Sequence, residues 1–350
     1  YPGNFDYGQE LASVEVRLGK LLHRVGRSVE AEQHVNQALE IRQSLWKNHP
    51  ERPSNRVALA WTHGQLAHVL AATGRAADAD AHGKTAMDTC RDQTATCPEV
   101  AEYHSALASA KFRRARYCTT QGEYKSASAH YESCVKIYTQ LIERAPKPEQ
   151  KAALAQCLDN RAMLKHRFLG QPGEQDYRKA IEIKAELVNQ FPENTWYAFS
   201  LGKSRNNFAN ASTNASKVTQ LRRDNVILAD RISSRYADRF DTRQFQAAAY
   251  ANLGYSCYYA LRYDEAATAF RKSLSLNPER SRSHYYLGRV LLAQGEMQAA
   301  LAEMEKEPVP VYQVTGMAMV YHAIENKEAS RQALAKLIDN WGEAGAFQIA

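Results

Sequence analysis

The side chains that could bind a metal or act in catalysis are scattered along this chain without the spacing that such sites require. The sequence contains 11 histidines and 6 cysteines, but no Cys-x-x-Cys pair and no His-Glu-x-x-His stretch. His63 and His68 are five positions apart, and neither motif surrounds them. We therefore expect histidines that pack or face solvent, cysteines that stay buried and reduced, and neither a metal nor another cofactor.

Motifs for nucleotide binding and for covalent catalysis are absent as well. The chain has no Gly-x4-Gly-Lys-Ser/Thr loop, no Gly-x-Gly-x-x-Gly loop, no Gly-x-Ser-x-Gly elbow and no His-Arg-Asp or Asp-Phe-Gly kinase motif. Acidic residues often stand three or four positions from a basic one, which is typical of exposed helix faces. The sequence predicts that this segment is not an enzyme, and it leaves open a kinase or other catalytic domain in a full-length parent.

The helices that position these side chains follow a sequence repeat. Prolines recur at a spacing of 48 in the N-terminal half, and one more follows after 46: Pro2, Pro50, Pro98, Pro146 and Pro192. Glycines keep the same 48-residue spacing between them: Gly26, Gly74 and Gly122. Because proline stops a helix and glycine permits the turn after one, each repeat is predicted as helix, glycine turn, helix and proline stop.

Residues 1–242 are thus predicted to hold five long repeats of 46–48 residues. The predicted first helices span about 6–24, 54–72, 100–119, 150–168 and 195–212. The predicted second helices span about 28–47, 76–91, 124–143, 174–190 and 216–238. The fifth repeat is the least regular, because residues 210–225 contain no glycine turn.

The period shortens in the C-terminal part, where Leu253-Gly254 is followed 34 residues later by Leu287-Gly288. The stretch 250–278 has an aromatic residue, then Leu-Gly, Ala, Phe and Pro at fixed offsets. This pattern resembles the tetratricopeptide repeat (TPR), a helix pair of about 34 residues that buries its apolar face only by stacking on its neighbours. We predict an all-α fold, a right-handed TPR α-solenoid of about eight helix pairs. Residues 243–350 would form typical repeats, with a ninth beginning at Trp341 and cut at the C-terminal end.

The long N-terminal repeats resemble those of kinesin light chains. They resemble still more the arrays that follow the kinase domain in many large bacterial serine/threonine kinases. The segments 26–45 and 175–210 carry this resemblance. It implies a protein-binding scaffold or sensor module, the C-terminal part of a bacterial signalling protein such as a serine/threonine kinase.

In this repeat family the first helices line a concave groove, and the resemblance places residues at fixed offsets in it. The resulting set is rich in basic, aromatic and amide side chains and poor in acids, which suits an extended, acidic peptide or partner protein. The Lys/Asn carboxylate clamp of chaperone-binding repeats is not present. The groove residues implied are Lys20, His23, Arg24, Trp61, His68, Phe112, Arg116, His166, Arg167, Asn206, Asn210, Tyr255, Tyr259, Tyr285 and Arg289.

A helical-repeat module that binds single-stranded RNA is the alternative function, because basic and aromatic helix faces also bind single strands. The net charge of +7 is modest for 350 residues, and the basic residues form no continuous stripe, so nucleic acid is the less favoured partner.

Neither a signal peptide nor a run of 18 apolar residues is visible, so we expect no membrane insertion and a cytoplasmic location unless the parent has a transmembrane helix upstream. The chain begins without Met and ends inside a predicted helix, which we interpret as a fragment cut at both ends.

Overall fold

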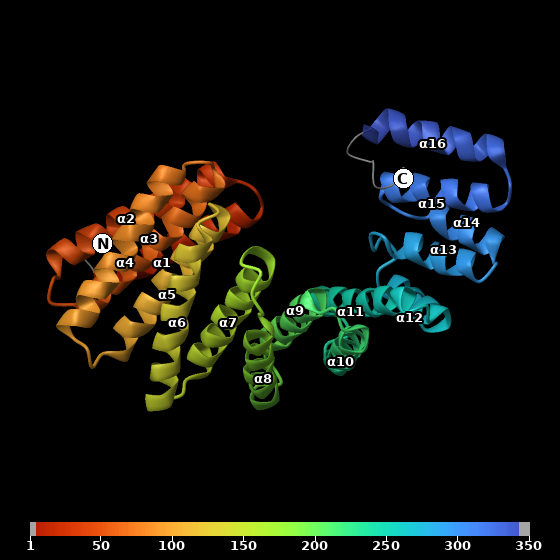
Figure 1. Cartoon of the computed structure of the whole chain (residues 1–350). Coiled ribbons are helices and arrows are strands. Elements are labelled where there is room, and N and C mark those ends of the chain that lie inside the picture. Colours follow the sequence, from red (N-terminus) through yellow and green to blue (C-terminus); the bar gives the residue numbers. More distant parts are fainter. Residues whose placement is uncertain (1–4, 343–350) are drawn as a thin grey trace. The chain divides into compact units, whose positions relative to one another are not determined.

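The computed structural model describes residues 5–342, and it consists of α-helices joined by short turns (Figure 1). The chain divides into two compact parts, an N-terminal unit (Tyr1–Gln190) and a C-terminal unit (Phe191–Ala350). Sixteen helices and no strand lie within the described range. The prediction of an all-α solenoid of about eight helix pairs is confirmed.

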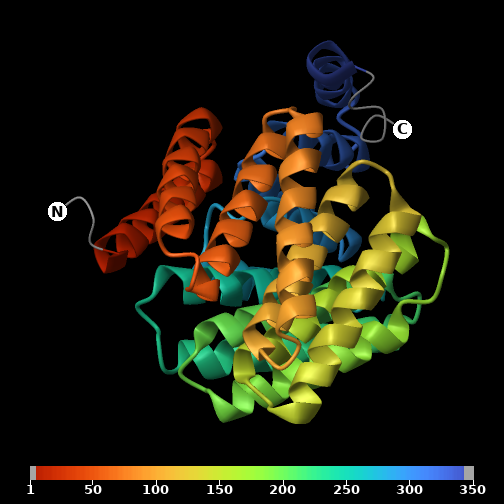
Figure 2. The same cartoon turned by 90° about the vertical axis from the view of Figure 1, so that its left-hand side faces the viewer.

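The N-terminal unit contains four helix pairs, and neighbouring pairs lie side by side in both views (Figures 1 and 2). Seven of its helices agree with the predicted ranges to within two residues, and α4 extends five residues further. Its helices are α1 (Phe5–Arg24), α2 (Ser28–Asn48), α3 (Pro53–Ala72), α4 (Ala76–Thr96), α5 (Ala101–Thr120), α6 (Tyr124–Arg144), α7 (Pro148–Phe168) and α8 (Glu174–Gln190).

The C-terminal unit also contains four pairs, and its later helices are shorter. In the turn between α9 and α10, the side chain of Asn214 accepts a hydrogen bond of 2.9 Å from the backbone N–H of Lys217, so an asparagine cap takes the place of the missing glycine. Its helices are α9 (Thr195–Ala211), α10 (Ala215–Ser233), α11 (Phe240–Tyr259), α12 (Tyr263–Leu276), α13 (Ser283–Ala293), α14 (Met297–Glu305), α15 (Pro310–Ala323) and α16 (Lys327–Trp341).

The glycine turns have the backbone that the 48-residue spacing predicts. Gly26, Gly74 and Gly122 have φ angles of 84°, 79° and 78°, in the left-handed region. A Cβ atom added at any of the three would meet no atom within 4 Å. Glycine is therefore required at these turns for its backbone conformation and not for space.

Elsewhere, small residues let two helices of one repeat approach closely. A Cβ added at Gly254 of α11 would lie 2.8 Å from the ring of Phe270 on α12, and one at Gly19 of α1 would lie 2.7 Å from Val35 on α2. Phe270 is fully buried, as the resemblance to the repeat implies. All six cysteines are free thiols, and five of them are buried.

The first helices of successive pairs contact one another, which creates a continuous surface. In the N-terminal unit α1 contacts α3, α3 contacts α5, and α5 contacts α7, whereas successive second helices make no comparable contacts. We call the surface formed by α1, α3, α5 and α7 the first-helix face.

Two predictions about organisation are not decided by this arrangement. The predicted change of repeat length at residue 242 stays a prediction. The division after Gln190 separates two compact units and does not test the length of the repeats. Trp341 is the last residue of α16 and Gly342 is its C-cap, and residues 343–350 of the predicted ninth repeat lie outside the described residues. Within residues 5–342 no helix is both long enough and apolar enough to span a membrane.

Candidate binding face of the N-terminal unit

The centre of the first-helix face is a tryptophan between two cations. Lys20 of α1 places its Nζ 4.1 Å from the ring centroid of Trp61 on α3, and the Arg42 guanidinium carbon lies 5.5 Å from the same ring. Arg42 comes from α2 and is only 5% exposed. It donates hydrogen bonds to the carbonyl oxygen of Ala58 (3.0 Å) and to the hydroxyl of Thr62. Burial lowers its pKa to about 10.

Two histidines continue this face toward the ends of α1 and α3. The rings of His23 and His68 meet edge to face, with centroids 4.9 Å apart. The pKa of His68 is lowered first by partial burial and then by the neighbouring basic residues Arg116, His23 and Arg113. The basic surroundings therefore disfavour the charged form of His68.

The two histidines that sequence spacing singled out are not brought together. His63 lies against His82 of α4, with their Nδ1 atoms 2.8 Å apart. Burial, with a smaller effect of His82, lowers the pKa of His63 to about 4. Within residues 5–342 no group of three or more His, Cys, Asp or Glu side chains is placed to hold a metal ion.

Arg113 of α5 is a partly buried cation that the repeat pattern does not identify. Its Nε atom is buried without a hydrogen-bond partner, and a Cβ added at Gly64 of α3 would lie 2.5 Å from it. Burial lowers its pKa below the usual value for arginine. Glycine at position 64 thus makes the space that this guanidinium occupies between α3 and α5.

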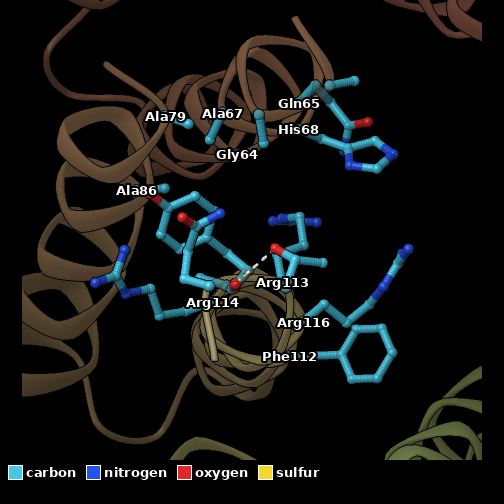
Figure 3. Close-up of a pocket in the computed structure, with 17 residues that line it drawn as sticks. Gly64, Gln65, Ala67, His68, Ala79, Ala86, Phe112, Arg113, Arg114 and Arg116 are labelled. Carbon is cyan, nitrogen blue, oxygen red and sulfur yellow. Dashed lines mark hydrogen bonds between the residues drawn. The ribbon is translucent and has the colours of Figure 1, made fainter. Parts of the chain in front are cut away.

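Arg113 borders two hollows. One, of about 480 Å³, lies between α3, α4 and α5 and is lined by small residues together with His68 and Arg116 (Figure 3). The other, of about 730 Å³, is lined by Arg42, Trp61 and parts of α5 and α7. Cations therefore stand at the border of both spaces.

The charges around Lys20 lack the compensation found elsewhere in the N-terminal unit. The charged groups that act on Lys20 are Arg113, Arg17 and Arg42, all of them basic, and they lower its pKa together with the larger effect of burial. Other cations of the first helices pair with carboxylates of second helices, as in the ion pairs of Arg114 with Asp80 and of Arg161 with Asp176. The positive charge without an acidic partner is therefore confined to the group around Lys20.

The other predicted groove residues of this unit lie on first helices. Arg24, Arg116, His166 and Arg167 are exposed. Phe112 packs edge to face on the buried Tyr131, with centroids 5.9 Å apart, so part of its ring belongs to the core.

In the C-terminal unit, two predicted residues take part in an internal network. The side-chain oxygen of Asn210 accepts a hydrogen bond of 2.6 Å from the buried Arg222, and that of Asn206 accepts from Arg222 and from Asn225. These amides satisfy a buried guanidinium, which leaves them less capacity for a ligand.

The remaining predicted residues form an aromatic cluster around one cation. The guanidinium carbon of Arg289 lies 5.0 Å from the ring centroid of Tyr258 and 5.5 Å from those of Tyr285 and Tyr286. Tyr285 is only 7% exposed, so its ring contacts Arg289 from the buried side of the cluster. Tyr259 is exposed, and Tyr255 packs edge to face on Phe270 and on Tyr286.

Comparisons with known proteins agree with this architecture. Residues 252–310 match the sequence model of the tetratricopeptide repeat family. Comparison with curated protein sequences gives no match.

Among solved structures, the chain is similar to the apo form of RapI, at 13% identity and a TM-score of 0.61, over 94% of this chain and 87% of that one. It is also similar to PH0952 from Pyrococcus horikoshii, described as a Signal Transduction ATPase with Numerous Domains protein with a tetratricopeptide repeat sensor. That match has 12% identity and a TM-score of 0.59, over 97% of this chain and 54% of that one. At such identities the likeness concerns the fold alone.

Proposed function

We propose that this chain is a non-catalytic protein-interaction module, and that its first-helix face binds an extended, acidic segment of a partner protein. One observation carries this proposal: Lys20 and Arg42 both lie over the ring of Trp61, in surroundings whose charges lower the pKa of Lys20 and are all basic. An acidic ligand would supply the missing counter-charges through charge-assisted hydrogen bonds. Trp61 and Phe112 would add apolar and stacking contacts.

The extended form of the ligand follows from where the cations stand. Lys20, Arg116 and Arg167 belong to α1, α5 and α7, so they recur along the face from one helix pair to another. A compact ligand would reach only one of these positions at a time. An extended segment would reach several, and their small individual contributions would add.

Fluorescence anisotropy with three pools of short labelled peptides tests this function. Acidic peptides should bind, while neutral and basic pools of the same length should not. The affinity should fall with salt, because the Debye length shrinks from about 10 Å at 0.1 M to about 3 Å at 1 M. A single-stranded RNA of equal charge is the fourth probe, since the RNA-binding alternative rests on the same basic and aromatic residues. Equal binding of all peptide pools, or tighter binding of the RNA, would contradict the proposal.

We further propose that the parent protein is a bacterial, cytoplasmic signalling protein in which this array serves as a sensor or scaffold next to a kinase domain. The support is the resemblance of the long repeats to the arrays of bacterial serine/threonine kinases. The sensor described for PH0952 offers a parallel in another signalling protein. Sequencing the gene upstream of Tyr1 tests this part, and an upstream region without a catalytic domain would refute it.

A further inference from the structure

Two adjacent arginines of α5 have opposite surroundings. Arg114 forms an ion pair with Asp80 of α4, so its charge is compensated within the fold. Arg113 points from α5 toward Gly64 of α3, and its buried Nε has no hydrogen-bond partner (Figure 3). Within residues 5–342 no ion pair joins Arg113 to a carboxylate.

A buried Nε–H without a partner is costly, because a polar group that leaves water must be compensated by a hydrogen bond. The charge of Arg113 also lowers the pKa values of Lys20 and of His68, in each case with a smaller effect than burial. A negatively charged group beside Arg113 would offset this effect on both neighbours and would accept the hydrogen bond of its Nε.

The hollow next to Arg113 has a different chemistry. Small apolar residues of α3, α4 and α5 line it, among them Ala67, Gly83 and Ala110. Its volume of about 480 Å³ lies within the range of about 300–1,000 Å³ that binding pockets usually have. Exposed His68 and Arg116 stand at one side of it, toward the first-helix face (Figure 3).

We infer that this hollow is an anchor pocket, in which Arg113 binds a carboxylate of the partner peptide and the small-residue walls receive the large apolar side chain next to that carboxylate. The inference rests on the proposed function and names a subsite of it. The pairing of an unpartnered guanidinium with an apolar hollow favours a peptide over a free inorganic anion, since an inorganic anion would leave the apolar walls without a partner.

Three synthetic peptides separate the two parts of this subsite. The first is acetyl-Gly-Glu-Phe-Glu-Gly-amide, the second has Gln in place of both Glu, and the third has Ala in place of Phe. Isothermal titration calorimetry should show the first peptide binding the full chain about tenfold more tightly than either of the others. Inorganic phosphate, added at a concentration comparable to that of the peptide, is expected not to displace the first peptide.

Two variants assign each preference to its part of the site. Arg113→Met keeps the length of the side chain and removes its charge, so it should abolish the preference for Glu over Gln and keep the preference for Phe. Gly83→Leu should do the reverse, because a Cβ at Gly83 meets only the end of Arg114 at 3.9 Å and the longer side chain fills the hollow. Leucine is also the better helix former, so α4 should keep its fold.

A purely structural role for Arg113 predicts a different result. If Arg113 only held α3 and α5 together, Arg113→Met would lower the thermal midpoint of the free chain. We expect the midpoint to stay the same or to rise, because a buried Nε–H without a hydrogen-bond partner is removed. Arg114→Met is the matched control: it breaks the ion pair with Asp80 and should lower the midpoint while both peptide preferences remain.

The inference is overturned if Arg113→Met retains the preference for Glu, if Gly83→Leu retains the preference for Phe, or if phosphate displaces the first peptide. These outcomes leave the proposed function standing as long as the longer acidic peptides still bind the first-helix face. Should Arg113→Met fail to fold, Arg113→Lys keeps the test open, because it retains the charge and should retain part of the preference for Glu.

Discussion

The ammonium of Lys184 lies 2.5 Å from a carboxylate oxygen of Asp159, and both side chains are buried between α7 and α8. Lys184→Met should lower the free energy of unfolding by about 3–5 kcal/mol, because it leaves the carboxylate of Asp159 buried without its countercharge. Urea unfolding followed by circular dichroism measures the change.

The double variant Lys184→Met with Asp159→Leu should recover most of this loss, since well-packed apolar residues can replace a buried ion pair. Lys179→Met is the control on the same helix, because its ion pair with Glu182 is exposed and contributes about 0–1 kcal/mol. Equal losses for Lys184→Met and Lys179→Met would show that the buried pair has no special weight.

A second prediction concerns acid stability of the C-terminal unit. The hydrogen bond from His284 and the nearby Lys306 ammonium outweigh burial and hold the pKa of Glu303 at about 2, below its usual 4.5. Because the folded-state pKa is depressed, this contribution is fully present above pH 4.5 and is lost as the pH falls toward 2.

Urea midpoints measured at several pH values across this window should therefore fall less steeply for Glu303→Gln than for the parent chain. Glu305→Gln, an exposed position of the same helix, serves as the control and should follow the parent curve. Parallel curves for Glu303→Gln and the parent would rule out a role of Glu303 in acid stability.

A third prediction tests the register of the repeats. Ala127 of α6 is fully buried against Tyr131 and Leu164, so Ala127→Trp should overpack the contact and cost about 1–3 kcal/mol or more. Ala129→Trp, at an exposed position of the same helix, should change stability little. Because solenoid repeats couple mainly to their neighbours, hydrogen exchange should rise in the pairs around α6 first. Uniform exchange along the whole chain would contradict nearest-neighbour coupling.

The helices were predictable because their markers act locally. A glycine such as Gly74 fixes a left-handed turn whatever surrounds it, and a proline such as Pro98 excludes a continuing helix. The helix boundary in the fifth repeat was harder to predict, because no glycine marks the turn. Asn214 caps α10 there through a side-chain hydrogen bond. Helix ends were less predictable than the turns, as the five additional residues of α4 show.

The binding face was predictable only in part. The fixed repeat positions that line the groove in the tetratricopeptide repeat family include Arg116 but not Arg113. These positions identify side chains on the surface of the groove, and they do not identify a side chain that lies between two helices. Which cation lacks an acidic partner depends on contacts between α3, α4 and α5 that no local pattern encodes. One signal was present: Gly64 stands inside a helix, where glycine costs about 1 kcal/mol and often marks a close approach.

The last prediction concerns the long-range charge of the first-helix face. Arg116 and Arg167 are exposed at the ends of α5 and α7, so both can change sign without disturbing the core. Each exposed pair with an acidic ligand contributes only about 0–1 kcal/mol, but both together steer the ligand and hold it at two points. Arg116→Glu with Arg167→Glu should weaken binding of the acidic peptide pool about tenfold at low salt, and much less at high salt.

The matched control reverses two charges on a second helix of the same unit. Lys125→Glu with Lys136→Glu changes the net charge by the same amount at exposed positions of α6. If net charge alone attracted the peptides, both double variants would lose the same affinity. The first-helix face is the binding surface only if the arginine variant loses clearly more than the lysine variant, with both chains keeping the parent thermal midpoint.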